Sequence, residues 1–191
     1  MYTTARYLGL RQLQQRLEQL MAKNRHRRVS AREVAFMITA TAGGTGVVLN
    51  NCDLSSELLA GFSLHSARLR NAILEDANFA CARLQNADLS HAHASDIHLE
   101  EADLSKANVS SACLKGALIS GASFPEANLS GADLSNSTAR NVNFMRANAT
   151  KLNLVRGDDD VRWMRCDTHM RYRCACSLNR TLTARGSLRR A

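Results

Sequence analysis

Apolar residues recur at every fifth position through the middle of this chain. If the leucine of each five-residue unit is taken as its centre, centres run from Leu49 to Leu154 without a gap. Of these 22 centres, 14 are Leu, three are Phe, three are Ala, one is Val and one is Ile, so none is polar. Two residues before the centre, 14 of the 22 positions are Ala. One period therefore governs more than half of the chain.

A period of five fits neither an ordinary helix nor a flat strand. Residues five apart on an α-helix are turned by about 140°, so the leucines would spiral around the rod. On a strand, successive leucines would point to opposite faces. The leucines can share one interior only if the backbone turns a corner in every unit, always in the same sense. The pattern predicts a β-solenoid that buries its apolar residues by stacking repeats.

The repeated phrase Ala-Asp/Asn-Leu-x-x, as in EANLSGADLS at 126–135, resembles the pentapeptide-repeat family over about residues 47–157. The resemblance implies a right-handed quadrilateral β-helix with four pentads in each coil and about five coils. Residues twenty apart would then stack in columns along the rod. We expect an amide ladder of Asn108, Asn128 and Asn148 after Asp88, and a mixed-charge column of Lys106, Glu126 and Arg146.

The pattern is weakest at its start, where Glu57 and Phe62 take positions that favour Ala. An unpaired carboxylate cannot be buried cheaply. Either the first coil is distorted there, or Glu57 finds a partner in the N-terminal segment. We favour distortion, because the end coils of solenoids are usually atypical.

Residues 1–46 are predicted to form a helical N-terminal segment. Apolar residues at helical spacing form a stripe among Arg and Gln, at Leu10, Leu13, Leu17, Leu20 and Met21. The basic run KNRHRR follows as a connector, and Ser30 to Glu33 has capping-box spacing before the apolar run VAFMITA. The segment is interpreted as a cap on the open end of the rod. A partner-binding helix, a membrane-surface helix and an export signal are the alternatives.

Charge divides the chain into three unequal parts. Residues 1–48 carry net +6, residues 49–157 net −2 and residues 158–191 net +4, which together give the +8 of the whole chain. The last part, 158–191, is rich in Arg and Cys and has no apolar period. It is predicted to be a basic, mostly disordered tail, with a cap built on Trp163 and Tyr172 or a nucleic-acid contact as alternatives.

The start of the sequence lacks the apolar stretch and cleavage site of a secretory signal peptide. The most apolar stretch, 34–49, is too short and too rich in glycine to span a bilayer. We expect a cytoplasmic protein, or one secreted by a route that uses no cleaved signal peptide.

Nothing in the sequence predicts a catalytic or metal site. His91, His93 and His98 are close in sequence, but outward side chains on a convex coil diverge. The tail contains four possible zinc ligands, Cys166, His169, Cys174 and Cys176. They do not form the two well-spaced Cys/His pairs that a typical zinc site has. The protein is predicted not to be an enzyme and to need no cofactor. Cys52, which takes an inward slot, and the outward Cys81 and Cys113 are expected to be reduced.

The remaining candidate is the surface of the solenoid, which suits binding of a macromolecule. A weak candidate is an acidic face containing Glu75, Asp76, Asp96, Glu100, Glu101 and Asp103, in which Asp76 and Asp96 would stack directly. An ordinary solvated face is the simpler interpretation. In another column, Leu58 and Leu118 flank Asn78 and His98 as a small apolar patch.

We expect a non-enzymatic scaffold that binds a protein partner of unknown identity. The family resemblance implies two roles, a bacterial effector delivered without a cleaved signal, or a DNA-mimic modulator of DNA gyrase of the quinolone-resistance type. The short region before the repeats suits the first role. The nearly neutral repeat and the basic C-terminal part depart from the second.

Overall fold

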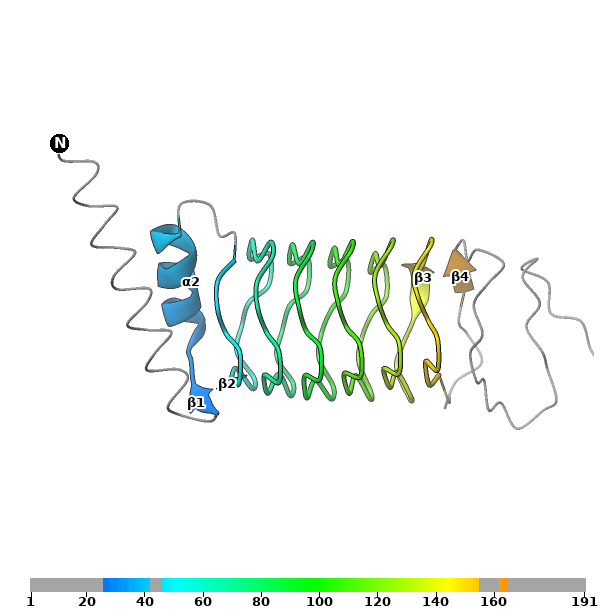
Figure 1. The fold of residues 1–191 in the computed structure, drawn as a ribbon, viewed down its shortest axis with the longest axis horizontal. Coiled ribbons are helices and arrows are strands. Elements are labelled where there is room, and N and C mark those ends of the chain that lie inside the picture. Colours follow the sequence, from blue (N-terminus) through cyan, green and yellow to red (C-terminus); the bar gives the residue numbers. More distant parts are fainter. Residues whose placement is uncertain (1–25, 42–45, 155–161, 165–191) are drawn as a thin grey trace, which may run out of the picture.

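The computed structural model describes residues 26–41, 46–154 and the backbone of 162–164, and these form a rod (Figure 1). The chain winds around the rod axis in successive coils, and a helix lies across the N-terminal end. The regular elements are β1 (Arg27–Arg28), α2 (Ala31–Ala40), β2 (Cys52–Asp53), β3 (Arg140–Asn143) and β4 (Arg162–Met164). None of the helices among the described residues has the length and apolar character needed to cross a membrane.

Each coil of the rod contains twenty residues, or four pentads. Parallel bridges join the residue before each centre to the residue twenty positions later, from Val48↔Arg68 to Asp133↔Asn153. These bridges define four outward columns in order around the coil. We call them the Asn108 face (48, 68, 88, 108, 128, 148), the Asp53 face (53, 73, 93, 113, 133, 153), the Leu58 face (58, 78, 98, 118, 138) and the Ser63 face (63, 83, 103, 123, 143). Because each coil has four sides, the Asn108 and Leu58 faces lie opposite each other.

A tight turn at every corner explains the five-residue period. In a typical pentad, the amide of Ala107 donates to the carbonyl of Leu104 across 3.0 Å, and Lys106 between them has φ 58°. A β-turn whose third residue has positive φ is of this kind. That position is left-handed in all 22 pentads, in 17 non-glycine residues and five glycines. The chain therefore changes direction once per pentad.

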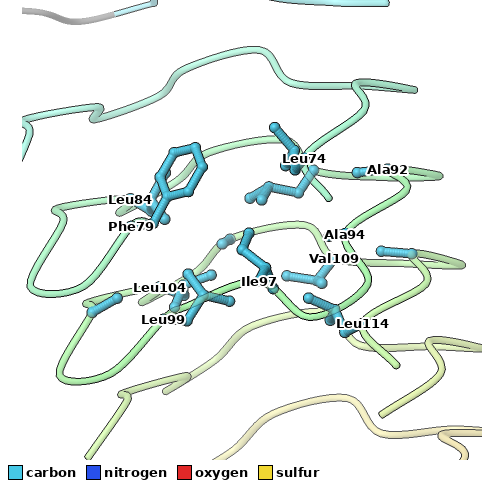
Figure 2. Packing of buried hydrophobic residues seen from close by; sticks show 14 of the residues in the cluster. Leu74, Phe79, Leu84, Ala92, Ala94, Ile97, Leu99, Leu104, Val109 and Leu114 are labelled. Carbon is cyan, nitrogen blue, oxygen red and sulfur yellow. The ribbon is translucent and has the colours of Figure 1, made fainter. Parts of the chain in front are cut away.

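The centres form the core that the sequence predicts. No centre from Leu49 to Leu154 is more than 5% exposed. Figure 2 shows part of this stack, with Phe79, Leu84, Leu99 and Leu104 directed into the interior together. Near the C-terminal end, the rings of Phe124 and Phe144 stack with centroids 5.2 Å apart. The residue two before the centre is buried as well in most pentads, Cys52 included.

The first coil is regular, so the favoured interpretation of Glu57 was wrong. The backbone at Glu57 keeps the turn bond to Leu54 at 3.1 Å and the coil-to-coil bond from Asn78 at 2.9 Å. The carboxylate Oε2 accepts a hydrogen bond from the amide of Ala31 at 2.7 Å. The alternative, a partner from the N-terminal segment, is what the structure contains. The side chain avoids burial without a partner because the first turn of α2 supplies a free N–H.

The predicted capping box at the start of α2 is present. The Ser30 hydroxyl accepts from the Glu33 amide, and the Glu33 carboxylate accepts from the Ser30 amide at 2.9 Å. The bond from the Ser30 amide is the largest of the effects that lower the pKa of Glu33. Val34 of α2 is fully buried against the rod, where it joins the same core as the centres.

Part of the basic run KNRHRR forms an extra rung on the Asp53 face instead of a plain connector. Strand β1 pairs in parallel with β2, which places Arg28 opposite Asp53. Val29 follows it into the core and is 2% exposed. His26, with φ 63°, takes the place of a corner residue. Residues 26–29 thus repeat the geometry of a pentad before the helix begins.

At the other end, β4 pairs in parallel with β3, with Val142 opposite Trp163 and Asn143 opposite Met164. This strand lies within the predicted tail of 158–191. Of the predicted tail cap, only the backbone of Trp163 is described. Tyr172, the possible zinc ligands and the helical stripe of residues 10–21 lie outside the described residues, so those predictions are untested.

Candidate functional site

The outward Asp and Asn residues of the repeat hold the corners together. In pentads with Asp or Asn before the centre, the side-chain oxygen accepts a hydrogen bond from the amide two residues later, as Asn128 does from Ser130 at 3.2 Å. On the Asn108 face these side chains also bond to each other along the rod. Asn148 donates to Asn128, Asn128 to Asn108 and Asn108 to Asp88, at 3.0 to 3.2 Å. The predicted amide ladder is therefore present.

Asp103, one of the six predicted acidic site residues, has such a structural role. Its Oδ1 accepts from both the amide and the hydroxyl of Ser105, and its Oδ2 accepts from Gln85 at 2.6 Å. Burial raises the pKa of Asp103, but the hydrogen bonds from Ser105 and Gln85 outweigh it and leave that pKa below its ordinary value. Asp103 lies on the Ser63 face, apart from the other five.

The other five acidic residues border one face of the rod. Glu75, Asp76 and Asp96 lie at the corner between the Asp53 and Leu58 faces, and Glu100 and Glu101 lie at the corner between the Leu58 and Ser63 faces. All five are exposed except Glu100, which is half-buried. The structure thus brings these residues together as the two edges of the Leu58 face.

The Leu58 and Leu118 column occupies the middle of that same face. Asn78 and His98 separate the two leucines, as predicted, and Leu58 is 71% exposed. His98 Nδ1 lies 3.9 Å from Glu100 Oε1, which connects the column to one acidic edge. Along the sequence, the acidic residues and the apolar patch are separate predictions. Their shared face follows from the positions of both sets within the twenty-residue coil.

Two glycines make room for the acidic side chains, and sequence reasoning missed both. A Cβ placed on Gly116 would lie 2.1 Å from Asp96 Oδ1, and one on Gly121 would lie 3.1 Å from Glu101 Cγ. Each glycine stands twenty residues after the carboxylate that leans over it. The signal in the sequence is this spacing of glycine after an acidic corner residue. Gly116 and Gly121 therefore help to set where the edge carboxylates lie.

The acidic character of the Leu58 face is confined to its N-terminal part. From Glu75 to Glu101 its edges carry five carboxylates. Farther along the same edges come Lys115 and Arg140. We call the part bounded by the five acids, with Asn78 and His98 in its middle and Leu58 one coil before Asn78, the acidic face.

The histidines do not converge. His91 lies at a corner, His93 on the Asp53 face and His98 on the Leu58 face. Within the ranges that the structure describes, no group of three His, Cys, Asp or Glu side chains could hold a metal ion. Burial of the Cys52 thiol raises its pKa to about 11, which keeps that sulfur protonated at neutral pH.

The comparisons with known proteins agree with the coil geometry. A family model described as Pentapeptide repeats matches in eight copies, over residues 82–121 and 127–158. Residues 82–121 and 127–158 are therefore pentapeptide repeats. No curated protein matches the chain.

Solved structures of pentapeptide-repeat proteins resemble the chain. Rfr23 from the cyanobacterium Cyanothece 51142 has 22% identity and a TM-score of 0.47, with 59% of this chain and 91% of that chain covered. HetL from Nostoc sp. strain PCC 7120, involved in heterocyst differentiation regulation, has 23% identity and a TM-score of 0.39 over 65% and 72%. A trypsin-treated form of QnrB1, a plasmid-mediated fluoroquinolone resistance protein, has 23% identity and a TM-score of 0.38 over 56% and 53%.

Proposed function

We propose that this pentapeptide-repeat protein is a non-enzymatic scaffold that binds a protein partner on its acidic face. The proposal takes the rod as a right-handed β-helix of about five coils, as the family resemblance implies. Pentapeptide-repeat proteins are generally scaffolds of this kind, and the outward side chains of a convex rod diverge instead of enclosing a substrate.

The observation that carries the proposal is that an exposed apolar side chain and several carboxylates share the Leu58 face. The exposed Leu58 begins a column in which carboxylates border Asn78 on one edge and His98 on both edges, and backbone turns hold these edges at fixed spacing. Asp76 and Asp96 place two negative charges at successive corners of one edge, which favours a cationic partner. Complementary charge around an apolar contact is the arrangement that gives protein interfaces their specificity. The partner is therefore a protein segment with Arg or Lys on both sides of an apolar side chain.

The test uses a fluorescent peptide with a central leucine flanked by arginines, and its anisotropy with the full-length protein. We expect binding that weakens with added salt. Replacing Asp76 and Asp96 with Asn, together with Leu58→Ser, should abolish it. Glu126→Gln, which removes an exposed acid from another corner, is the control and should bind normally. Equal binding by all variants, or equal binding of a peptide with the arginines replaced by glutamates, contradicts the proposal.

Modulation of DNA gyrase is the second candidate. The observation that favours it is the set of carboxylates along the two edges of one face, because a DNA mimic needs negative charge at regular spacing. A supercoiling assay with purified gyrase tests it. Inhibition or protection that disappears in the Asp76→Asn and Asp96→Asn variant supports this role, and no effect at excess protein removes it.

Delivery as a bacterial effector is a further proposal about the same scaffold. The layout of a predicted helical segment followed by the repeats supports it. Fusion of residues 1–46 to a reporter enzyme, followed by measurement of the reporter outside the producing cell, tests it. Retention of the reporter in every secretion-competent strain contradicts it.

A further inference from the structure

The N-terminal end of the rod gathers exposed arginines from three separate segments. Arg28 comes from β1, Arg32 from α2, and Arg68 and Arg70 from the second coil of the rod, and all four are exposed. Arg68 lies on the Asn108 face, Arg70 at the adjoining corner and Arg28 on the Asp53 face beyond that corner. Residues about forty positions apart in the sequence thus form one cationic rim.

The carboxylates near this rim are engaged elsewhere. Glu33 pairs with Arg27 at 2.7 Å, Asp53 accepts from Ser55 at 2.6 Å, and Glu57 accepts from the Ala31 amide. Asp88, the next residue after Arg68 in its column, accepts from Ser90 and Asn108. Over the described ranges, none of the four rim arginines forms an ion pair with a carboxylate. The guanidinium groups of Arg32, Arg68 and Arg70 therefore remain available for an external anion, whereas that of Arg28 also acts on the Asp53 carboxylate opposite it.

An exposed apolar side chain lies on the helix that covers this end of the rod. Helix α2 buries Val34 against the rod, and Phe36, two residues later and on the opposite side of the helix, is 56% exposed. Arg32 lies one turn before Phe36 on this outer side. As Figure 1 shows, α2 lies at the end of the rod, so its outer side is directed away from the coils.

We propose that the N-terminal end of the rod docks on a bilayer surface that contains anionic lipids. Arginines would contact the lipid phosphates and carboxylates, and Phe36 would enter the boundary between headgroups and acyl chains. Duplex nucleic acid would use the arginines alone, whereas a bilayer uses both the cations and the exposed phenyl ring. This surface is distinct from the acidic face, so the two proposals can fail separately.

The test measures cosedimentation of the full-length protein with vesicles of phosphatidylcholine, with and without a quarter of phosphatidylserine. We expect binding to the vesicles with phosphatidylserine only, with a decline as salt rises. Arg68→Gln with Arg70→Gln should weaken partitioning by on the order of tenfold. Phe36→Ser should weaken it while leaving the salt dependence in place.

The matched control is Arg146→Gln with Lys151→Gln. It removes the same charge from exposed positions at corners of the Asn108 face near the other end of the rod, and it should bind as the unchanged protein does. Unchanged melting temperatures show that each variant is folded. Equal losses of vesicle binding in the two double variants would overturn the proposal. It would also be overturned if the protein bound a DNA duplex but neither kind of vesicle. No effect of Phe36→Ser would overturn it as well.

Discussion

Glu57 joins the N-terminal helix to the rod through one hydrogen bond. Its carboxylate accepts from the Ala31 amide, the first of the amides that a helix leaves without an internal partner. The repeat favours Ala at this position, so the sequence departs from its own pattern where it supports the cap. The Glu57 carboxylate is therefore explained by its contact with the helix and not by the pentad pattern.

Replacing Glu57 with Ala should loosen α2 without unfolding the rod. The Ala31 amide then loses its acceptor, which costs about 1–3 kcal/mol locally. Hydrogen exchange of the Ala31 and Val34 amides should accelerate, while the amides around Leu104 stay protected. Glu57→Gln keeps an acceptor oxygen and should retain most of the protection. Unchanged exchange in Glu57→Ala would show that packing of Val29 and Val34 holds the helix by itself.

Leu104 tests the inward direction of the centres. Its side chain is fully buried among other centres, so Leu104→Asp places a carboxylate without a partner in the core. The expected loss of stability is several kcal/mol, roughly 3 or more, seen as a large fall in the melting temperature.

The control for Leu104 must be an outward residue that bonds to no carboxylate. Ser105 follows Leu104 but is unsuitable, because its hydroxyl donates to Asp103 and an added carboxylate there would meet a like charge. Ser111 is exposed at a corner with φ 56°, a conformation that Asp tolerates. Ser111→Asp should change the melting temperature little. Similar losses for the two variants would refute the inward direction.

At the level of elements, the pentad is a short strand followed by a turn, and its outward amide supports both. Asn128 donates to Asn108 at 3.2 Å, and its oxygen accepts from Asn148 and from the Ser130 amide. The ladder therefore links adjacent coils while the same oxygen holds a corner. This double use explains why the repeat favours Asp or Asn before so many of its centres.

Asn128→Ala should lower stability by about 2–3 kcal/mol, because it removes three hydrogen bonds of roughly 1 kcal/mol each. Asn128→Asp keeps the acceptor for Ser130 and Asn148 and should cost less. Thr138→Ala is the control at the same pentad position on the Leu58 face, where the expected change is within about 0.5 kcal/mol. Chemical denaturation of the three variants gives the order. Equal stability of Asn128→Ala and Thr138→Ala would show that the ladder contributes nothing.

At the level of the whole molecule, the rod is a one-dimensional stack in which each coil contacts only its neighbours. Both ends therefore need cover. At the N-terminal end, β1 and α2 supply it. At the C-terminal end, β4 adds one strand to the Ser63 face by pairing with β3. The acidic face lies on the Leu58 face and the rim on the Asn108 and Asp53 faces, and their opposite charges favour different partners.

Because β4 ends at Met164, a truncation that tests the tail should keep the chain up to this residue. A chain that ends at Met164 keeps β4 and is expected to melt as the full chain does. A chain that ends at Leu154 loses β4 and should expose the β3 edge, so hydrogen exchange of Val142 and Phe144 should accelerate. Circular dichroism of both should show mainly β-structure with a helical minority. If the chain ending at Met164 aggregates or loses protection, residues 165–191 are a cap and the predicted disordered tail is wrong.

The sequence by itself determined the five-residue repeat and its interior. A five-residue apolar period leaves no other way to bury one set of side chains, so Leu49 to Leu154 all proved to be buried centres. The capping box and the amide ladder also followed from local spacing, because each depends on residues at a fixed separation. The six acidic residues were predicted as one face, and five of them do border one face.

Only the tertiary structure decided which outward residues share a surface. Each surface of the rod combines residues from different pentads. The sequence therefore did not show that the acidic edges and the Leu58 column share one face, whereas the stacked coils do. The partner of Glu57, the rung formed by β1 and the rim of Arg28, Arg68 and Arg70 depend on how the segment before the repeat folds back onto it. The sequence of residues 26–41 has no five-residue period. Its position on the rod is set by the Glu57 carboxylate, by strand β1 and by the burial of Val29 and Val34.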